Sequence, residues 1–353
     1  MKKHLMQLIL TGLIFFIYCS GTYCQGLDKD KQYNIVTLAF YNLENLFDTL
    51  DTEDVRDTEF TPAGEKNWNT EKYNKKLVNM ASVISQLGTE INPDGPAILG
   101  VCEIENRSVL EDLIKTGKLK EQNYQIVHYD SPDKRGIDVG LIYQPKYFKV
   151  TSSKSYTLKI DGLDDFYTRD QLLVSGLLHG EPIHVMVSHW PSRRGGQKGS
   201  NFKRVAAADL GRSVIDSILN ADPKAKIFYM GDLNDDPVDE SVKKHLLTEA
   251  KAENVSGKIM FNPMEPLFKK GIGTLAWRDV WNLFDQILMT SSLVEKDYSS
   301  FRYYGVKVFN KDFLKQQSGK YQGYPYRTFV GSSFKGGYSD HFPVYTFLIK
   351  EKK

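Results

Sequence analysis

Acidic, amide and imidazole side chains flank several apolar runs in this 353-residue sequence. Each run has the length and composition of a β-strand, and the polar residues lie just past one of its ends. The residues in these places are Asn42, Glu44, Glu103, His189, Asp232, Asn234, Asp285, Asp340 and His341. Because the ends of neighbouring strands meet at one rim, we expect these side chains to share a cleft, where they suit a divalent metal and acid-base chemistry.

The carboxylates in this set favour a hard divalent cation. Glu44, Glu103 and Asp340 offer oxygen ligands, which suit Mg²⁺ or Mn²⁺, with Ca²⁺ as a further option. Only three cysteines are present, which argues against a structural zinc site built from several thiolates. A single carboxylate is more often a solvated surface group or a helix cap, so the prediction of a metal site rests on the whole set.

Alternating strands and helices are predicted along the chain, and they must position these residues. Runs rich in β-branched and apolar residues predict strands over 34–41, 97–101, 124–127, 139–143, 171–178, 182–188, 226–230, 284–289 and 344–349. Apolar residues at helical spacing predict helices over 72–87, 107–114 and 201–219. With no linker or repeat, this pattern predicts one α/β domain, a four-layer sandwich of two packed mixed β-sheets flanked by helices.

The first residues have the layout of a signal peptide. Lys2 and Lys3 precede an apolar run from Leu5 to Tyr18, and small and polar residues follow. The run is shorter than the roughly 20 residues of a transmembrane helix. We therefore predict a signal peptide over 1–24 and a mature catalytic domain over 25–353, exported to the periplasm or secreted.

The cysteines bear on this prediction only weakly. A lipoprotein anchor at Cys19 is a less favoured alternative, because the bulky Tyr18 precedes it where lipid-attachment signals carry a small residue. Cleavage near Cys24 would leave Cys102 as the remaining thiol, so no internal disulfide is expected. Cys102 follows an apolar run and is predicted to be a buried core residue rather than a nucleophile.

Composition and charge describe a folded chain without identifying its ligand. Hydrophobic residues make up 41% and charged residues 25% of the sequence, which is typical of a globular protein. The formal net charge is only +2. Nucleic-acid binding must therefore be argued from local groups of Lys and Arg rather than from overall charge.

Seven sequence blocks resemble, in order, the signature of the endonuclease/exonuclease/phosphatase superfamily, which has a pancreatic-type deoxyribonuclease-like fold. They are Asn42 in "FYNLEN", Glu103 in "GVCEIEN", Asp138 in "RGIDVGLIY", His189 in "VSHWPS", "GDLND" at 231–235, Asp285 in "FDQIL" and "SDHFPV" at 339–344. The fuller forms "SHWPSRRGG" and "GGYSDHFPV" are most similar to the exported bacterial branch, which includes extracellular nucleases. No single block is specific for this superfamily. Seven blocks in the right order, each beside a predicted strand, are specific for it.

The resemblance implies a division of roles around a phosphate. Glu103 would be the principal metal ligand, assisted by Glu44 and Asp340, directly or through water. Asn42 and Asn234 would bind the scissile phosphate or orient its attacker.

Acid-base groups complete the implied site. Asp232 would position or deprotonate the attacking water, and two carboxylate-histidine pairs would supply imidazoles: Asp138 with His189, and Asp285 with His341. An ionised partner would raise the pKa of each imidazole. His128 and His184 lack such motifs and are predicted to be structural or exposed.

Two arginines are candidate phosphate ligands. Arg169 in "YTRDQ" resembles a family arginine that contacts substrate phosphate, and a surface ion pair with Asp170 is the alternative. Arg193 belongs to a Gly-rich basic loop after His189 that could hold a flanking phosphate of a polymer. The alternative for that loop is simple solvation.

The glutamate block departs from the family pattern. Cys102 stands where much of the superfamily has Gln, and a second acid, Glu105, follows Glu103 by two residues. If the strand continues, both acids point the same way. The choice of Glu103 as ligand therefore rests on the resemblance.

The leading hypothesis is an exported, divalent-metal-dependent phosphodiesterase, a monomer that acts as an endonuclease or exonuclease on nucleic acid by means of activated water. One alternative is an esterase of the same superfamily that acts on a phospholipid or a phosphoinositide, because a fold does not decide a substrate. Another is a non-catalytic surface-binding module, which predicts erosion of the polar set. No erosion is visible, since Asp232, Asn234, Asp285, Asp340 and His341 are all present.

Overall fold

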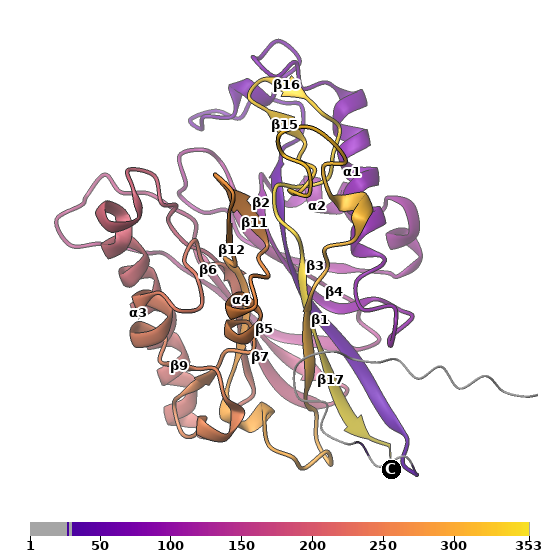
Figure 1. Ribbon diagram of the computed structural model, residues 1–353, viewed down its shortest axis with the longest axis vertical. Helices are drawn as coiled ribbons and strands as arrows, with labels where there is room; N and C mark the ends of the chain where they lie inside the picture. The colour runs from indigo at the N-terminus through magenta and orange to yellow at the C-terminus, as the bar shows by residue number, and fades with distance from the viewer. Residues whose placement is uncertain (1–26, 28–29, 353) are drawn as a thin grey trace, which may run out of the picture.

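Two packed β-sheets with helices on their outer faces make up the computed structural model, which describes residue 27 and residues 30–352 (Figure 1). The predicted signal peptide over 1–24, with Cys19 and Cys24, lies outside the described residues. Within residues 30–352, no helix is long and apolar enough to cross a membrane. The predicted sandwich of two mixed sheets is confirmed.

The first sheet has six strands. In spatial order they are β14 (Arg302–Val308), β17 (Val344–Glu351), β1 (Tyr33–Leu46), β2 (Pro96–Ile104), β4 (Asp138–Tyr143) and β3 (Gln125–His128). Strands β1 and β2 are parallel, while β17, β4, β3 and β14 pair antiparallel with their neighbours.

The second sheet has seven strands, two of them very short. In order they are β5 (Phe148–Tyr156), β6 (Gln171–Leu178), β7 (Glu181–His189), β8 (Ile227–Asp232), β13 (Asp285–Met289), β10 (Met260–Phe261) and β9 (Thr248–Glu249). Strands β7 and β8 are parallel, and β13 runs antiparallel to β8. Two small ribbons stand apart, β11 (Leu275–Trp277) with β12 (Val280–Asn282), and β15 (Phe329–Val330) with β16 (Ser333–Phe334).

Helices cover both outer faces. α1 (Thr70–Ile84) and α2 (Arg107–Ile114) lie on the right of Figure 1 against the first sheet, and α3 (Gln197–Ala221) lies on the left against the second. Asn69 and Asn106 cap α1 and α2 by accepting hydrogen bonds from backbone N–H groups of the first turn. The remaining helical segments are short: α4 (Glu265–Lys269), η1 (Thr58–Phe60), η2 (Gly117–Glu121), η3 (Ser241–His245), η4 (Ala252–Asn254), η5 (Ser291–Leu293) and η6 (Asp312–Leu314).

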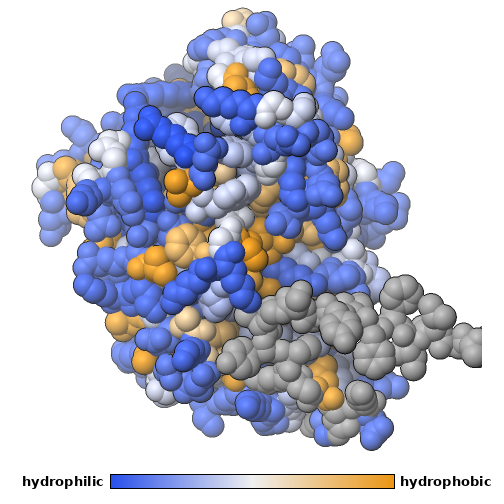
Figure 2. Space-filling model, viewed as in Figure 1, coloured by the Kyte–Doolittle hydropathy of each residue, from blue (hydrophilic) through white to orange (hydrophobic). Residues whose placement is uncertain are grey.

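The alternation of side chains along β1 builds two cores at once. Leu38 and Phe40 point into the core between the sheets, whereas Ala39 and Tyr41 pack under α1 and α2. A third core lies beneath α3. Hydrophilic residues cover most of the face seen in Figure 2, and apolar ones show chiefly near its middle, as expected when apolar faces pack inside.

The connections explain why polar residues from distant parts of the chain meet. Parallel strands end at the same edge, so β1 and β2 both end at one rim of the first sheet, and β7 and β8 at one rim of the second. Strand β13 is antiparallel and therefore begins where β8 ends, with Asp285 opposite Asp232. Strand β17 likewise begins beside the far part of β1, with Val344 opposite Phe40.

Most of the predicted elements are present, with shifted bounds. The helix predicted over 107–114 has those bounds, while the helices predicted over 72–87 and 201–219 form residues 70–84 and 197–221. Strands β5 and β14 were not predicted. Both are partly exposed, and β5 carries several Ser and Lys residues, so they lack the continuous apolar run of a buried strand.

Gly231 is a test of the close approach of β7 and β8. A Cβ atom there would lie 2.0 Å from the Ser188 carbonyl oxygen, which is backbone and cannot swing aside. Gly231→Ala should therefore lower the free energy of unfolding in urea by roughly 1–3 kcal/mol or more. Gly305→Ala in β14 is the matched control, because a Cβ there meets nothing within 4 Å. Equal stability of the two variants would contradict the crowding.

Candidate active site

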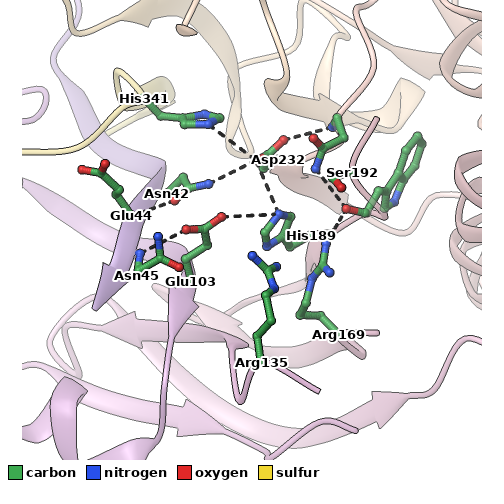
Figure 3. Close-up of polar contacts among 12 residues, drawn as sticks. Asn42, Glu44, Asn45, Glu103, Arg135, Arg169, His189, Ser192, Asp232 and His341 are labelled. Atoms are coloured by element: carbon green, nitrogen blue, oxygen red, sulfur yellow. Dashed lines mark hydrogen bonds and ion pairs between the residues drawn. The ribbon is translucent and has the colours of Figure 1, made fainter. Parts of the chain in front are cut away.

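Asp232 lies where the rims of the two sheets meet, and side chains from both sheets converge on it (Figure 3). Its Oδ2 accepts a hydrogen bond of 3.1 Å from Asn42 Nδ2, which belongs to the first sheet. The Nε2 atoms of His189 and His341 lie 3.6 and 3.8 Å from the same oxygen. Its Oδ1 accepts a hydrogen bond from the backbone N–H of Asn234. The structure thus brings these five predicted residues together.

The backbone is unusual where the strands enter the site. Glu44, Asn45, Glu103 and Asn234 all have positive φ, between 47° and 57°. Left-handed conformations of non-Gly residues are uncommon and concentrate at functional sites. Here they interrupt the pairing of β1 with β2 and of β2 with β4, so the side chains turn out of the regular alternation. One result is that the backbone N–H of Asn45 donates to Glu103 Oε2 at 3.0 Å.

His341 and Asp285 form the predicted pair. Nδ1 of His341 lies 2.6 Å from Oδ2 of Asp285, and the Asp285 side chain is fully buried at the start of β13. Burial alone would lower the pKa of His341, but the carboxylates of Asp285 and Asp232 raise it well above its ordinary value. His341 is therefore a buried imidazolium whose Nε2 faces Asp232.

His189 is in the opposite state. Burial and the positive charges of Arg169, Arg135 and His341 hold its pKa well below the ordinary histidine value. Within the described chain, its Nδ1 has no hydrogen-bond partner. Its Nε2 faces Asp232 and also lies 3.9 Å from Glu103 Oε1. His189 is a neutral imidazole, and a pair of groups whose pKa values are driven apart is the arrangement expected of an acid and a base.

The predicted pair of Asp138 with His189 is wrong. Asp138 Oδ2 instead lies 2.8 Å from His128 Nε2, and Asp138 Oδ1 accepts a hydrogen bond of 2.8 Å from the backbone N–H of Ser131. The reason is topological, because Asp138 begins β4 and His128 ends the adjacent strand β3 of the first sheet, whereas His189 belongs to the second. The His128 side chain is buried in this pair, which agrees with its prediction as a structural histidine.

The amides of Asn42 and Asn234 are partly used within the protein. Asn42 donates to Asp232, and its Oδ1 accepts the backbone N–H of Glu44 at 2.9 Å. Asn234 Nδ2 donates to the Trp190 carbonyl oxygen at 3.0 Å. Each Nδ2 has a second N–H, so both can still face a phosphate while holding the strand ends in place.

Among the predicted metal ligands, Glu103 has an open oxygen. Its Oε2 accepts from Asn45, while Oε1 accepts no hydrogen bond within the described chain. An oxygen donor of this kind fits a divalent cation such as Mg²⁺ or Mn²⁺. Asp232, Asp285 and His341 also hold ligand atoms within 4.8 Å of one another, but the His341–Asp285 hydrogen bond already accounts for two of them.

Glu44 and Asp340 are bridged by Arg327, a residue that the sequence did not single out. Arg327 Nε lies 3.0 Å from Glu44 Oε1, and its Nη2 lies 2.8 Å from Asp340 Oδ2. The backbone N–H of Thr328 occupies the other Glu44 oxygen at 2.6 Å. A cavity of about 120 Å³ adjoins Glu44, Asn45 and Arg327. The guanidinium therefore competes with a metal ion for Glu44 Oε1 and Asp340 Oδ2.

Lys76 is a second residue that sequence reasoning missed. It is almost fully buried, donates to Thr328 Oγ1 at 2.7 Å and to the Tyr338 carbonyl oxygen, and lies 3.9 Å from Glu44 Oε2. Burial lowers its pKa to about 8. Helical spacing could have revealed it, because position 76 falls on the same face of α1 as Tyr73 and Met80. It attaches the segment that carries Asp340 to α1.

Glu105 faces away from Glu103. It accepts hydrogen bonds from the backbone N–H of Asp48 at 2.6 Å and from Thr52 Oγ1 at 3.0 Å, and burial raises its pKa to about 7. The two acids do not share a direction because Glu103 has a left-handed backbone and β2 ends at Ile104. Glu105 supports the loop after β1.

The two arginines predicted to bind phosphate are held by carboxylates. Arg169 is buried and contacts Asp133 Oδ2 at 3.0 Å, so the alternative of a surface pair with Asp170 is wrong. Arg193 donates to the Asn234 carbonyl oxygen at 2.8 Å and packs over the Phe284 ring. Its Nη2 also contacts three acids, Asp235, Asp236 and Asp239.

Comparison with known families explains why these sequence blocks occur together in one chain. The sequence model of the Endonuclease/Exonuclease/phosphatase family matches residues 37–350, which include every site residue described above. This chain belongs to that family. Members of the superfamily are phosphoesterases and nucleases, typically with divalent metals, so this family member has a phosphoesterase-type fold. None of the curated proteins matches the chain.

Solved structures share the fold of this family member at low sequence identity. D. rerio TDP2 complexed with single strand DNA product has a TM-score of 0.52 and 15% identity, covering 89% of this chain and 98% of that chain. The human Nocturnin catalytic domain with bound sulfate anion has a TM-score of 0.53 and 15% identity, covering 92% and 98%. The Bacteroides thetaiotaomicron mannosyl-6-phosphatase Bt3783 has a TM-score of 0.51 and 15% identity, covering 89% and 99%.

Separate replacement of Glu103 and Glu105 by Gln tests which acid serves the metal. Mg²⁺ or Mn²⁺ should raise the melting temperature of the wild type, and Glu103→Gln should abolish this rise because its open oxygen loses its charge. Glu105→Gln should keep that response but unfold about 1 kcal/mol more easily, since it loses part of its hydrogen bonding to the loop after β1. If Glu105→Gln abolished the metal response and Glu103→Gln kept it, Glu105 would be the metal ligand and Glu103 the structural acid.

Asp285→Asn tests the charge state of His341. Removal of the carboxylate should let burial dominate, so the His341 pKa should fall, which NMR titration of the metal-free protein would show. In the wild type, the pair stabilises the fold fully at pH values below the ordinary histidine pKa of about 6.5 and loses this effect as pH rises through the raised pKa. The stability difference between the two proteins should therefore shrink at high pH. An unchanged titration would refute the assignment.

Proposed function

We propose that this protein is an exported, divalent-metal-dependent phosphodiesterase that hydrolyses nucleic-acid phosphodiester bonds by activated water. The observation that carries the proposal is the convergence of an imidazolium, His341, and a neutral imidazole, His189, on one buried carboxylate, Asp232. In-line hydrolysis needs a proton acceptor for water and a positive group for the charge that develops on the phosphate and the leaving oxygen. His189 is the neutral imidazole that can accept the proton, and His341 is the positive group.

Each side chain then has a task that follows from its contacts. His189 and Asp232 are the groups able to take a proton from water, and burial raises the pKa of Asp232 to about 7. His341, held by Asp285, stabilises negative charge or protonates the departing oxygen. Asn42 and Asn234 present their remaining N–H groups to the phosphate.

The same residues fit a metal ion. A bound Mg²⁺, or Mn²⁺ or Ca²⁺ in its place, would supply Lewis-acid charge to the phosphate, and Glu103 would hold it through its open Oε1. Glu44 and Asp340 would join when Arg327 releases them.

The substrate class within this proposal rests on the family. D. rerio TDP2 is described with a single strand DNA product, and the Bacteroides protein is described as a mannosyl-6-phosphatase. The same fold therefore serves different phosphate esters. The order of motifs and the resemblance to extracellular nucleases favour nucleic acid as the substrate. The leader over 1–24 favours export, and the exported protein would be the single domain over 25–353, acting as a monomer. A lipid phosphoesterase and a non-catalytic binding module are the alternatives that an experiment must separate.

A substrate panel tests the proposal. The purified mature chain should cleave plasmid DNA, RNA or bis-p-nitrophenyl phosphate with Mg²⁺ or Mn²⁺ and not with EDTA. Asp232→Ala and His341→Ala should each lower kcat about 100-fold or more without lowering the melting temperature into the assay range. His245→Ala is the matched control, because His245 also pairs with a carboxylate, Asp209, at 2.7 Å, but lies near α3 and outside the site.

Each other outcome points elsewhere. Cleavage of sphingomyelin or a phosphoinositide, but not of nucleic acid, would favour the lipid esterase. Metal-dependent cleavage of none of these substrates would refute the phosphodiesterase proposal and favour the binding module. Retained activity in Asp232→Ala or His341→Ala would overturn the assignment of roles.

A further inference from the structure

The arginine expected to bind phosphate, Arg169, is tied into the protein through both of its terminal nitrogens, and its buried Nε has no hydrogen-bond partner within the described chain. Its guanidinium is buried, with Nη1 3.0 Å from Asp133 Oδ2 and Nη2 donating to the Trp190 carbonyl oxygen. Arg169 precedes β6 and Trp190 follows β7, while Asp133 belongs to the turn before β4, and Figure 3 shows the guanidinium of Arg169 beneath His189. The contact with Trp190 holds the turn after His189 in place.

Asp133 links Arg169 to a second arginine, Arg135. Asp133 Oδ1 accepts the backbone N–H of Arg135 at 2.9 Å and lies 3.5 Å from Arg135 Nε. One carboxylate therefore faces two guanidinium groups, which leaves this cluster with one net positive charge. The side chains of Asp133 and Arg169 are buried, so the interaction between these two is weakly screened by solvent.

Arg135 is the open member of the cluster. Its side chain is 48% exposed, and neither Nη atom has a partner within the described chain. Figure 3 shows its guanidinium directed toward His189. Its charge is one of the causes that lower the pKa of His189, which agrees with this placement.

The turn that carries Arg135 is firmly anchored. The Gly136 N–H donates to the Asp133 carbonyl oxygen, and the Lys134 carbonyl oxygen accepts the backbone N–H of Arg56, both at 2.9 Å. Gly136 has φ of 66°, and a Cβ there would meet the Val55 side chain at 3.1 Å. The turn is therefore packed against the 55–57 segment and requires glycine after Arg135.

The observed pair of Asp138 and His128 has a structural role in this arrangement. Asp138 follows the turn by two residues and is fixed by His128 Nε2 and by the Ser131 N–H on its other side. The buried acids Asp133 and Asp138 thus clamp both ends of the short turn that presents Arg135. The fixed backbone of the turn therefore orients the exposed Arg135 side chain, although its Nη atoms have no partner within the described chain.

We propose that Arg135, and not Arg169, is the arginine that grips the non-bridging oxygens of the substrate phosphate, and that Asp133 positions it. The inference rests on the proposed phosphodiesterase function, whose site it completes. A guanidinium with two free Nη atoms matches the paired oxygens of a phosphate. It points toward His189 from the turn before β4 of the first sheet, and His341 lies against the same Asp232 oxygen as His189.

Arg135→Ala, Arg135→Lys and Lys134→Ala test the proposal against inorganic phosphate and bis-p-nitrophenyl phosphate. In Mg²⁺, Arg135→Ala should raise the Kd of inorganic phosphate, measured by calorimetry, and the KM of the ester about tenfold or more. Arg135→Lys should be intermediate, because lysine keeps the charge and loses the fork. Lys134→Ala is the matched control, because it removes an adjacent exposed cation that packs over Tyr167, and should behave as wild type.

The outcomes separate this inference from the function beneath it. If Arg135→Ala keeps the wild-type Kd and KM, or if the wild type binds no phosphate, the assignment of Arg135 is wrong. A variant that loses melting temperature or Mg²⁺ affinity but keeps its phosphate Kd would mark Arg135 as a structural counter-ion and overturn the proposal. If the wild type cleaves no ester but binds phosphate through Arg135, the phosphodiesterase proposal fails and the phosphate site stands.

Discussion

A hydrogen bond between Asn42 and Asp232 joins the two sheets at the point on which the site depends. Asp232 is buried, and a buried carboxylate is tolerated only when its oxygens have partners. Those partners come from four separated parts of the chain: Asn42, His189, Asn234 and His341. The sheets must therefore pack with their polar strand ends in contact, and a slip between them would break the hydrogen bond from Asn42 to the carboxylate.

The same constraint divides the two histidines. Both rings are buried beside Asp232, so burial acts on each in the same direction. Only His341 has a second carboxylate, Asp285, in hydrogen-bond contact, whereas His189 faces arginines from below. Two histidines buried to a similar depth thus differ in charge, one positive and one neutral, because one also contacts a carboxylate and the other lies near arginines. An acid and a base result without any difference in residue type.

Positive charge around the site is distributed in a comparable way. Arg169, Arg193 and Arg327 each bind carboxylates and serve the architecture, so their presence in the sequence says little about phosphate binding. What matters is which guanidinium keeps free donors after the buried acids are satisfied. Arg135 does so because Asp133 binds mainly its backbone and leaves the tip of the side chain open.

The sequence by itself determined the layered α/β fold and the strand ends that carry the polar residues, because periodicity is a local property, and the resemblance of its motifs to a known family implied the pairing of His341 with Asp285. Only the tertiary structure decided the partner of Asp138, the direction of Glu105, the burial of Lys76 and the freedom of Arg135. Each of these depends on which strand lies beside which, or on a single left-handed residue such as Glu103 that reverses a side chain. Contacts between distant segments follow from packing, and packing cannot be read from spacing along the chain.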